Sequence, residues 1–347
     1  MLLILTAGLL VAAGPVLSKA PAPLTLGTAG ERFTVNGTPR FLVLTSYFDA
    51  LDAARLDDDL AMLAKSVDGI RVFASWWDVR EDGDCRNAFA STGLIEMTGE
   101  GAARIRPQAL DRLRHVLRRA REHGLVVDLT FAADTVQGAS KLAANDQGRV
   151  CPPPGFENTV HWGAMAEAIG EVAAALDADE FDHVFFDLQN EAGHDWNRAT
   201  DDDLARLVQA VRGRAPKRLI SISSYDPDAD RQARRVRALK LSMLNFHDVP
   251  RGEGWGARTA GHVKKFRDAL QRAGVDVPVY AGEPDPDDHG HGTREFEQAV
   301  RGARDAGAGA WTFHHRDAYR LDDRALARGL DPVNRQVLSA LPGWLGR

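Results

Sequence analysis

The chain has 347 residues, of which 44% are hydrophobic and 27% charged, and its formal net charge is −6. This is the composition of an ordinary globular protein, and the length suits one large α/β barrel or two smaller domains. The negative charge argues against a general nucleic-acid-binding protein, because the neutralisation of phosphates requires a basic face.

The beginning of the chain predicts an export signal. Leu2–Leu17 is nearly all apolar, and Ser18-Lys19-Ala20 then offers small residues at the two positions that determine cleavage. The apolar run is short for a membrane span and is interrupted by Gly and Pro. No Lys or Arg precedes it, so a retained N-terminal anchor and a signal with an atypical start are alternatives. We expect residues 1–20 to be a signal peptide and residues 21–347 to be a single domain, secreted or periplasmic, without stable membrane association after signal removal.

A β-hairpin is predicted next. Phe33–Pro39 alternates apolar and polar residues around Asn36-Gly37, the dipeptide most typical of a two-residue hairpin turn. We expect this hairpin to cover the underside of the domain that follows.

The rest of the chain alternates short β-branched or aromatic runs with amphipathic stretches of helical length. The predicted strands are Phe41–Ser46, Gly69–Ala74, Leu125–Phe131, His183–Leu188, Arg218–Ser223, Leu241–Phe246, Val277–Ala281 and Gly309–Phe313. The predicted helices are Arg106–His123, Thr159–Leu176, Asp201–Arg214, Asp226–Leu239, Arg258–Ala273 and Thr293–Ala306. About eight strand–helix units predict an α/β fold, a (β/α)8 TIM barrel with a short N-terminal β-hairpin. A doubly wound open sheet is disfavoured, because no Gly-rich phosphate loop follows the first strand.

Two glutamates follow predicted strands at the end where barrel enzymes carry their sites. The fourth strand continues into Gln189-Asn190-Glu191, and the seventh into Gly282-Glu283-Pro284. Both carboxylates are therefore expected at the same rim, on opposite sides of the barrel mouth. Glycoside hydrolysis needs such a pair: one group protonates the leaving oxygen, and the other stabilises or bonds the oxocarbenium-like carbon.

Asn190-Glu191 together with Glu283 resembles the clan A glycoside hydrolases, most closely the cellulases and mannanases of family 5. The resemblance spans nearly the whole mature chain and extends to Arg71 on the second strand and Trp311 at the eighth. It implies a retaining enzyme that cleaves β-glycosidic bonds of a polysaccharide or oligosaccharide, with Glu191 as acid/base and Glu283 as nucleophile. It also implies that Asn190 holds the sugar 2-hydroxyl and that Arg71 hydrogen-bonds near the nucleophile.

Aromatic and histidine residues are also concentrated after the predicted strands. Indole rings stack on the C–H faces of sugars, and His side chains bond hydroxyl groups. We expect Trp77, Trp196, His247 and Trp311 to contact the carbohydrate substrate. Further residues of this kind are Trp76, His194, Trp255, His289, His291, His314 and His315. The long loops 76–104 and 132–158 are expected to build the walls of the cleft.

The sequence departs from the family pattern at two places. Members usually carry a Tyr two residues after the sixth-strand His, whereas Asp248 and Val249 follow His247 here. The usual third-strand His is also not evident, since that strand reads Asp128-Leu129-Thr130-Phe131. A non-catalytic carbohydrate-binding barrel is therefore one alternative hypothesis.

A metal-dependent barrel hydrolase is the other alternative. His247, Asp248, His289, His291 and His314 could bind a metal, but such enzymes normally carry His-x-His at the end of the first strand. Thr45-Ser46-Tyr47-Phe48-Asp49 stands there, so no metal or cofactor is expected. Cys85 and Cys151 could pair in an oxidising compartment or remain as two thiols.

Overall fold

The structure is a computed structural model that describes residues 23–75, 78–80, 94–99, 102–132, 149–151, 162–192, 199–247, 250, 252–284, 292–315, 317, 318, 321 and 324–347. The predicted signal peptide, residues 1–20, lies outside these ranges, and so does Cys85, the possible partner of Cys151. Within them, every helix is too short or too polar to cross a lipid bilayer.

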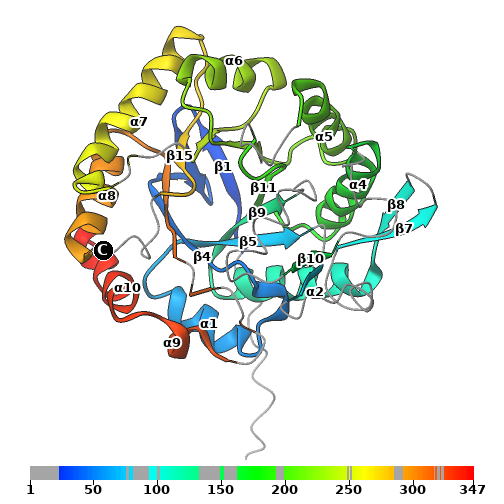
Figure 1. Ribbon diagram of the computed structural model, residues 1–347, viewed down its shortest axis with the longest axis horizontal. Coiled ribbons are helices and arrows are strands. Elements are labelled where there is room, and N and C mark those ends of the chain that lie inside the picture. The colour runs from blue at the N-terminus through cyan, green and yellow to red at the C-terminus, as the bar shows by residue number, and fades with distance from the viewer. Residues whose placement is uncertain are drawn as a thin grey trace, which may run out of the picture.

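A closed parallel sheet forms the centre of the molecule (Figure 1). Its strands are β4 (Leu42–Ser46), β5 (Gly69–Ser75), β9 (Val126–Ala132), β11 (Val184–Asp187), β12 (Ile220–Ser221), β13 (Ser223–Ser224), β14 (Leu244–Phe246), β15 (Val279–Ala281) and β16 (Ala310–Phe313). β12 pairs with β11, and β13 pairs with β14. Because only Ile222 separates β12 from β13, the two are halves of one strand that joins the two edges of the sheet. The predicted (β/α)8 barrel is confirmed.

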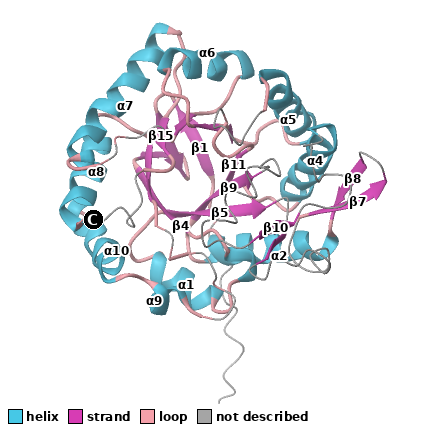
Figure 2. Cartoon of the chain, in the orientation of Figure 1, coloured by secondary structure: helices cyan, strands magenta, loops and turns pink. Residues whose placement is uncertain are grey.

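Helices surround the barrel as an outer ring (Figure 2). They are α1 (Leu56–Leu63), α2 (Pro107–Glu122), α4 (Trp162–Ala178), α5 (Asp201–Arg214), α6 (Ala229–Leu239), α7 (Trp255–Arg272), α8 (Thr293–Asp305), α9 (Leu326–Gly329) and α10 (Pro332–Leu345), with a short 3₁₀ turn at Ala50–Asp52. The six predicted helices agree with α2 and α4–α8 to within a few residues. The sequence-based prediction omitted α1, which is short, and α10, which contains Pro342.

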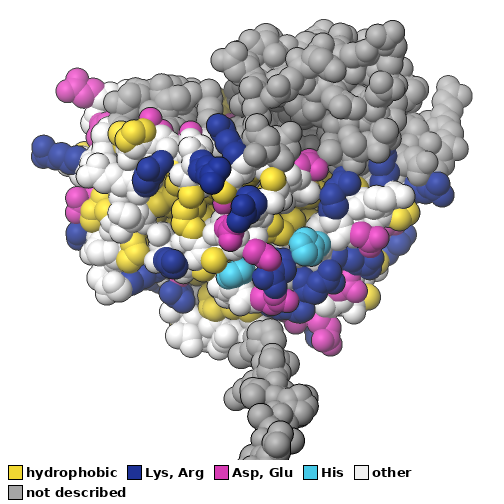
Figure 3. Space-filling model, turned by 90° about the horizontal axis from the view of Figure 1, so that it is seen from below, with side chains coloured by type: hydrophobic (Ala, Val, Ile, Leu, Met, Phe, Trp, Pro, Cys, Tyr) yellow, Lys and Arg dark blue, Asp and Glu magenta, His cyan; other side chains and the backbone are white. Residues whose placement is uncertain are grey.

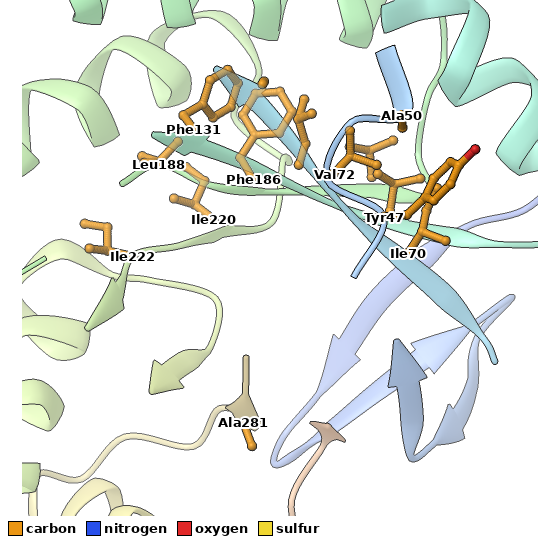
Figure 4. Packing of buried hydrophobic residues seen from close by; sticks show 14 of the residues in the cluster. Tyr47, Ala50, Ile70, Val72, Phe131, Phe186, Leu188, Ile220, Ile222 and Ala281 are labelled. Atoms are coloured by element: carbon orange, nitrogen blue, oxygen red, sulfur yellow. The ribbon is translucent and has the colours of Figure 1, made fainter. Parts of the chain in front are cut away.

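The main hydrophobic core lies between the strands and this ring. Ile70 and Val72 on β5, and Phe131 and Phe186 on β9 and β11, point into it together (Figure 4). The rings of Phe131 and Phe186 meet edge to face, with centroids 5.4 Å apart. Each buried side chain of this size contributes about 1.5–3 kcal/mol relative to an exposed one, so this layer supplies most of the driving force for folding.

A three-stranded antiparallel sheet covers the lower end of the barrel. β2 (Arg32–Val35) and β3 (Thr38–Arg40) form the predicted hairpin, and β1 (Leu26–Ala29) pairs with β2 on the other side. Asn36 and Gly37 have φ of 51° and 77°, as a type I′ turn requires. Phe33 is fully buried against Phe185, with ring centroids 6.2 Å apart. The hairpin prediction is confirmed, and the sheet closes the rim opposite the one that carries Glu191 and Glu283.

Two further strand pairs interrupt the regular alternation. β6 (Asp78–Arg80) pairs with β10 (Arg149–Cys151), and β7 (Ile95–Gly99) pairs with β8 (Ala102–Ile105). These segments belong to the two long loops of the sequence-based prediction. In Figure 1, β7 and β8 project from the ring beside α4, and the backbone N–H of Ile105 donates to Glu171 of that helix at 3.1 Å.

The described surface in Figure 3 carries interspersed basic and acidic side chains. Ion pairs between such side chains join neighbouring elements of the fold. Arg119 of α2, for example, lies 2.5 Å from Asp57 of α1 and also pairs with Glu122. Such exposed pairs stabilise the fold only slightly, at about 0–1 kcal/mol each.

Gly256 allows α7 to approach α8 closely. A Cβ atom at Gly256 would lie 2.1 Å from the carbonyl oxygen of Glu295, whereas one at Gly261 of the same helix would have no atom within 4 Å. Gly256→Ala should therefore lower the free energy of unfolding by about 1–3 kcal/mol or more, because a backbone atom must move. Gly261→Ala, the matched control, should be neutral or stabilising by up to about 1 kcal/mol. Urea unfolding monitored by circular dichroism measures both, and equal effects of the two substitutions would contradict the prediction.

Candidate active site

Glu191 follows β11 in an unusual backbone conformation. Its φ is 52°, a left-handed value that costs a residue with a Cβ atom roughly 1–3 kcal/mol. Ser223 of β13 holds this turn, since its hydroxyl accepts from the backbone N–H of Glu191 at 3.0 Å and its carbonyl accepts from Ala192 at 2.8 Å. The turn fixes the position of the carboxylate at the barrel mouth, where the side chain is 13% exposed.

Glu283 follows β15, and the residue before it must be a glycine. A Cβ atom at Gly282 would lie 2.1 Å from Oδ1 of Asn245 and 3.0 Å from Nε2 of His247. The absence of a side chain at Gly282 lets the chain pass close to β14 and leaves the Glu283 carboxylate, 21% exposed, beside His247 at the barrel mouth.

The structure brings Glu191, Glu283 and His247 together. Nδ1 of His247, which follows β14, lies 3.6 Å from Oε1 of Glu191 and 3.5 Å from Oε2 of Glu283. One side-chain oxygen of each glutamate and a ring nitrogen of His247 all lie within 4.8 Å of one another. The two carboxylates therefore share one small space at the carboxyl ends of strands β11 and β15.

Arg71 on β5 joins the two glutamate segments. Its Nη1 donates to Oε2 of Glu283 at 2.5 Å, and its Nη2 donates to Oδ1 of Asn190 at 2.7 Å. Its Nε donates to Oγ1 of Thr130 at 3.1 Å. The guanidinium is fully buried, so its planar fork holds both acceptors in one geometry.

The charges around Glu283 favour its ionised form. Burial alone would raise the pKa of this carboxyl, but His314 and Arg71 outweigh burial and hold the pKa of Glu283 well below its usual value. Burial of His247 lowers its pKa to about 3, so the ring is neutral near pH 7. Glu283 is thus a carboxylate that stays charged over the working pH range of most proteins.

A buried polar network lies beneath Arg71 inside the barrel. Asp128, which lies 3.7 Å from Nε of Arg71, accepts from Thr130 at 3.1 Å and from the Tyr280 hydroxyl at 2.9 Å. The Tyr280 hydroxyl also lies 2.6 Å from Oγ1 of Thr312. Asp128 compensates the buried charge of Arg71 and limits the movement of the guanidinium.

Two side chains at the site were not in the predicted set. Nε2 of His314 lies 3.5 Å from Oε1 of Glu283, and its Nδ1 lies 3.0 Å from the hydroxyl of Ser46. His314 follows β16, and Ser46 is the last residue of β4. Their positions at strand ends were the available signal. The sequence-based prediction placed His314 at this rim and named it as a possible metal ligand, and it gave Ser46 no role.

Trp311 is not at the site. It is fully buried in the layer between barrel and helices, where it stacks near Phe313, and Phe313 contacts Phe296 of α8. Strand side chains alternate between faces, so Thr312 and His314 face the barrel interior while Trp311 faces the helices. The prediction of Trp311 as a sugar contact is corrected, and His314 stands at the rim instead. Trp255 likewise packs in the core, at the start of α7.

The remaining predicted contacts lie outside the described residues. They include Trp77 and Trp196, and also Trp76, His194, Asp248, His289 and His291. Of the predicted set, the structure brings together Arg71, Asn190, Glu191, His247 and Glu283.

In the described part of the chain, one group of side chains is spaced closely enough to bind a metal ion. It consists of Glu191, His247 and Glu283. The guanidinium of Arg71, however, donates directly to Oε2 of Glu283 at 2.5 Å. A second cation at the same oxygen would be repelled, so this donor set fits a metal ion poorly.

Solved structures with the same fold include several polysaccharide-degrading enzymes. The β-mannanase of the blue mussel Mytilus edulis aligns with a TM-score of 0.57 at 15% identity, over 92% of this chain and 97% of its own. The endo-1,4-β-mannanase of Eisenia fetida aligns with a TM-score of 0.58 at 12% identity, over 92% and 96%. A Bacteroidetes-affiliated family 5 cellulase linked with a polysaccharide utilization locus aligns with a TM-score of 0.59 at 15% identity, over 88% and 91%. No protein-family model and no curated protein matches the sequence. At such low identity, the likeness establishes the common (β/α)8 barrel fold.

Asp187 on β11 provides a pH-dependent test of the network. Burial, and next the charge of Asp128, raise the pKa of Asp187 to about 7, although Ser223 donates to this carboxyl at 2.7 Å. The folded state then keeps a proton that the unfolded state loses above its ordinary pKa of 3.8. The free energy of unfolding should therefore fall as pH rises from about 4 to about 7 and then level off.

Asp187→Asn removes this contribution. The stability of the variant relative to the parent protein should increase between pH 5 and pH 8, as measured by urea unfolding at each pH. A difference that stays constant over this range would show that Asp187 ionises normally in the folded state.

Proposed function

We propose that the chain is a retaining glycoside hydrolase that cleaves β-glycosidic bonds of a polysaccharide or oligosaccharide, with Glu191 as acid/base and Glu283 as nucleophile. The proposal depends on the proximity of the two carboxylates. One oxygen of Glu191 lies within 4.8 Å of one oxygen of Glu283. Retaining enzymes hold their carboxyl groups about 5–5.5 Å apart, whereas inverting enzymes leave about 6.5–9.5 Å for a water molecule. The spacing supports retention through a covalent intermediate.

The environments of the two glutamates support different roles. His314 and the guanidinium of Arg71 hold the pKa of Glu283 well below its usual value, so the group is ionised, as a nucleophile must be. It attacks the anomeric carbon while the carboxylic acid of Glu191 protonates the departing glycosidic oxygen. In the second step, Glu191 removes a proton from water, the water oxygen bonds to the anomeric carbon, and the carboxylate of Glu283 departs.

Neighbouring side chains orient the reacting groups in this proposal. Oδ1 of Asn190 accepts from Arg71, so Asn190 acts on the sugar 2-hydroxyl through its amide N–H. His247 lies between the two carboxylates and contacts the same sugar unit. Trp77 and Trp196 are proposed as stacking platforms, from their places in the sequence.

The names of the solved neighbours indicate which substrates to test first. Two of them are described as β-mannanases and one as a cellulase. In a hydrolysis assay over a panel of glycans, β-linked glucans and mannans should therefore be tested first. Residues 1–20 are proposed as a signal peptide and residues 21–347 as the catalytic domain, which makes the substrate an extracellular or periplasmic carbohydrate.

Substitution of each glutamate tests the assignment. Glu283→Gln should abolish turnover of activated aryl β-glycosides, since the amide cannot form the glycosyl ester. Glu191→Ala should also lose activity, by about 10²–10⁴-fold. Azide should restore turnover of Glu191→Ala and yield a β-glycosyl azide, because the intermediate still forms on Glu283.

Glu253→Gln is the matched control, since Glu253 lies in the turn before α7 and its side chain is in none of the contacts described above. It should retain the parent activity. Full activity of Glu283→Gln on these substrates would refute the assignment. A protein that binds glycans from the panel but hydrolyses none of them is instead a carbohydrate-binding barrel.

A metal-dependent hydrolase is the second candidate function, which the spacing of Glu191, His247 and Glu283 favours. The contact of Arg71 with Glu283 opposes it. We predict that exhaustive dialysis against a chelator leaves the rate of glycoside hydrolysis unchanged and that added zinc does not raise it. Loss of activity after dialysis, with recovery on addition of zinc, would establish the metal-dependent alternative.

A further inference from the structure

Glu283 has a second polar neighbour on the side opposite Arg71. Arg71 contacts Oε2 of Glu283, and Nε2 of His314 lies 3.5 Å from Oε1. The other ring nitrogen of His314 lies 3.0 Å from the hydroxyl of Ser46. His314 is 4% exposed and Ser46 fully buried, so both side chains belong to the interior of the barrel mouth and are shielded from bulk water.

We propose that Ser46 and His314 form a positioning pair that holds Oε1 of Glu283, while Arg71 holds Oε2. This inference rests on the proposed function in so far as Glu283 is the nucleophile. The pair fixes the rotation of the carboxylate about its terminal bond and adds a donor on the face that Arg71 does not reach.

The chemistry of the three groups defines which nitrogen carries the proton. An ionised Glu283 only accepts hydrogen bonds, so the nitrogen that faces it, Nε2, must be protonated. In a neutral ring, Nδ1 is then an acceptor, and the Ser46 hydroxyl donates to it. In a charged ring, Nδ1 donates and the Ser46 oxygen accepts. The hydroxyl suits both states, and in both of them an N–H group points at Glu283.

Ring packing supports a fixed orientation of His314. The ring of Phe48 lies against it, with centroids 5.6 Å apart, and Phe48 itself stacks on Phe73 at 4.1 Å. Arg71 lies over both phenyl rings, at 5.5 and 5.1 Å. Arg71 and His314, the two groups beside the Glu283 carboxylate, thus both pack against the ring of Phe48, which follows β4.

His314 also contacts the Glu283 carboxylate at a place where members of the resembled family have a different side chain. The sixth strand lacks the Tyr that members of family 5 usually place against the nucleophile. His314 reaches Glu283 from β16 instead. Unlike a tyrosine hydroxyl, an imidazole can carry a positive charge, which would favour the ionised nucleophile further.

Ser46, His314 and Glu283 have the composition of a serine-hydrolase triad, but their arrangement does not suit that chemistry. Ser46 is fully buried at the end of β4, so its oxygen cannot reach a substrate carbonyl. Its role is to orient His314.

Nuclear magnetic resonance tests the arrangement without reference to activity. Long-range ¹H–¹⁵N spectra of the protein with labelled histidine report which ring nitrogens are protonated, and His314 is assigned by the loss of its signals in His314→Gln. We expect Nε2 of His314 to carry a proton at neutral pH. An unprotonated Nε2 with a proton on Nδ1 would overturn the pair.

Kinetics on an activated aryl β-glycoside tests the consequence for catalysis. His314→Ala should lower kcat by about 10–100-fold, the loss expected for one hydrogen bond to a charged group, with a smaller effect on KM. His314→Gln, which can still donate toward Glu283, should recover part of the rate. Ser46→Ala should slow the parent protein but have little further effect in the His314→Gln background, because the two side chains act in series.

His183→Gln is the matched control. His183 is equally buried, precedes β11 at the opposite end of the barrel, and its Nε2 lies 3.0 Å from the carbonyl oxygen of Leu117, so its substitution should leave kcat near the parent value. Additive effects of Ser46→Ala and His314→Gln, or a His314→Ala variant as active as the parent, would overturn the positioning role. If His314→Ala does not fold, His314→Gln and Ser46→Ala still decide the question. A parent protein that hydrolyses no glycoside but shows a protonated Nε2 would refute the proposed function and leave the contact established.

Discussion

The buried guanidinium of Arg71 is the group on which the arrangement of the barrel mouth depends. It donates to side chains that follow or lie on three different strands: Glu283, Asn190 and Thr130. A lysine has no planar fork and could not reach all three. Because a buried cation requires compensation, loss of one partner of such a pair typically costs about 3–5 kcal/mol. The orientation of the candidate site and the stability of the fold therefore depend on the same side chain.

The interior of the barrel is divided into two layers with different properties. The lower layer is apolar, since Phe33 of the N-terminal sheet packs there against Phe185. The upper layer is polar, and hydrogen bonds connect Asp128, Tyr280 and Thr312 within it. Apolar contacts tolerate small adjustments, whereas a hydrogen-bond network at low dielectric permits few alternative geometries. This division suits a protein in which the lower layer secures folding and the upper layer fixes the direction of charged groups.

The sequence predicted the barrel because its strands and helices differ in hydrophobic period, and it predicted Glu191 and Glu283 because both follow strands directly. It did not predict the direction of Trp311, because β16 is buried on both faces and so lacks the alternation that shows which side faces inward. The contact of Ser46 with His314 joins residues 268 positions apart, and no local pattern encodes it. The division of one strand at Ile222 became evident only from the closure of the sheet.

The left-handed backbone at Glu191 has a consequence for which residue suits this position. The conformation disfavours any residue with a Cβ atom and is most easily adopted by glycine, so glutamate strains the backbone at this position. A glycine in its place would relieve this strain but would remove the carboxylate. In the proposed function, this position therefore combines a strained backbone with a carboxylate that is fixed at the barrel mouth.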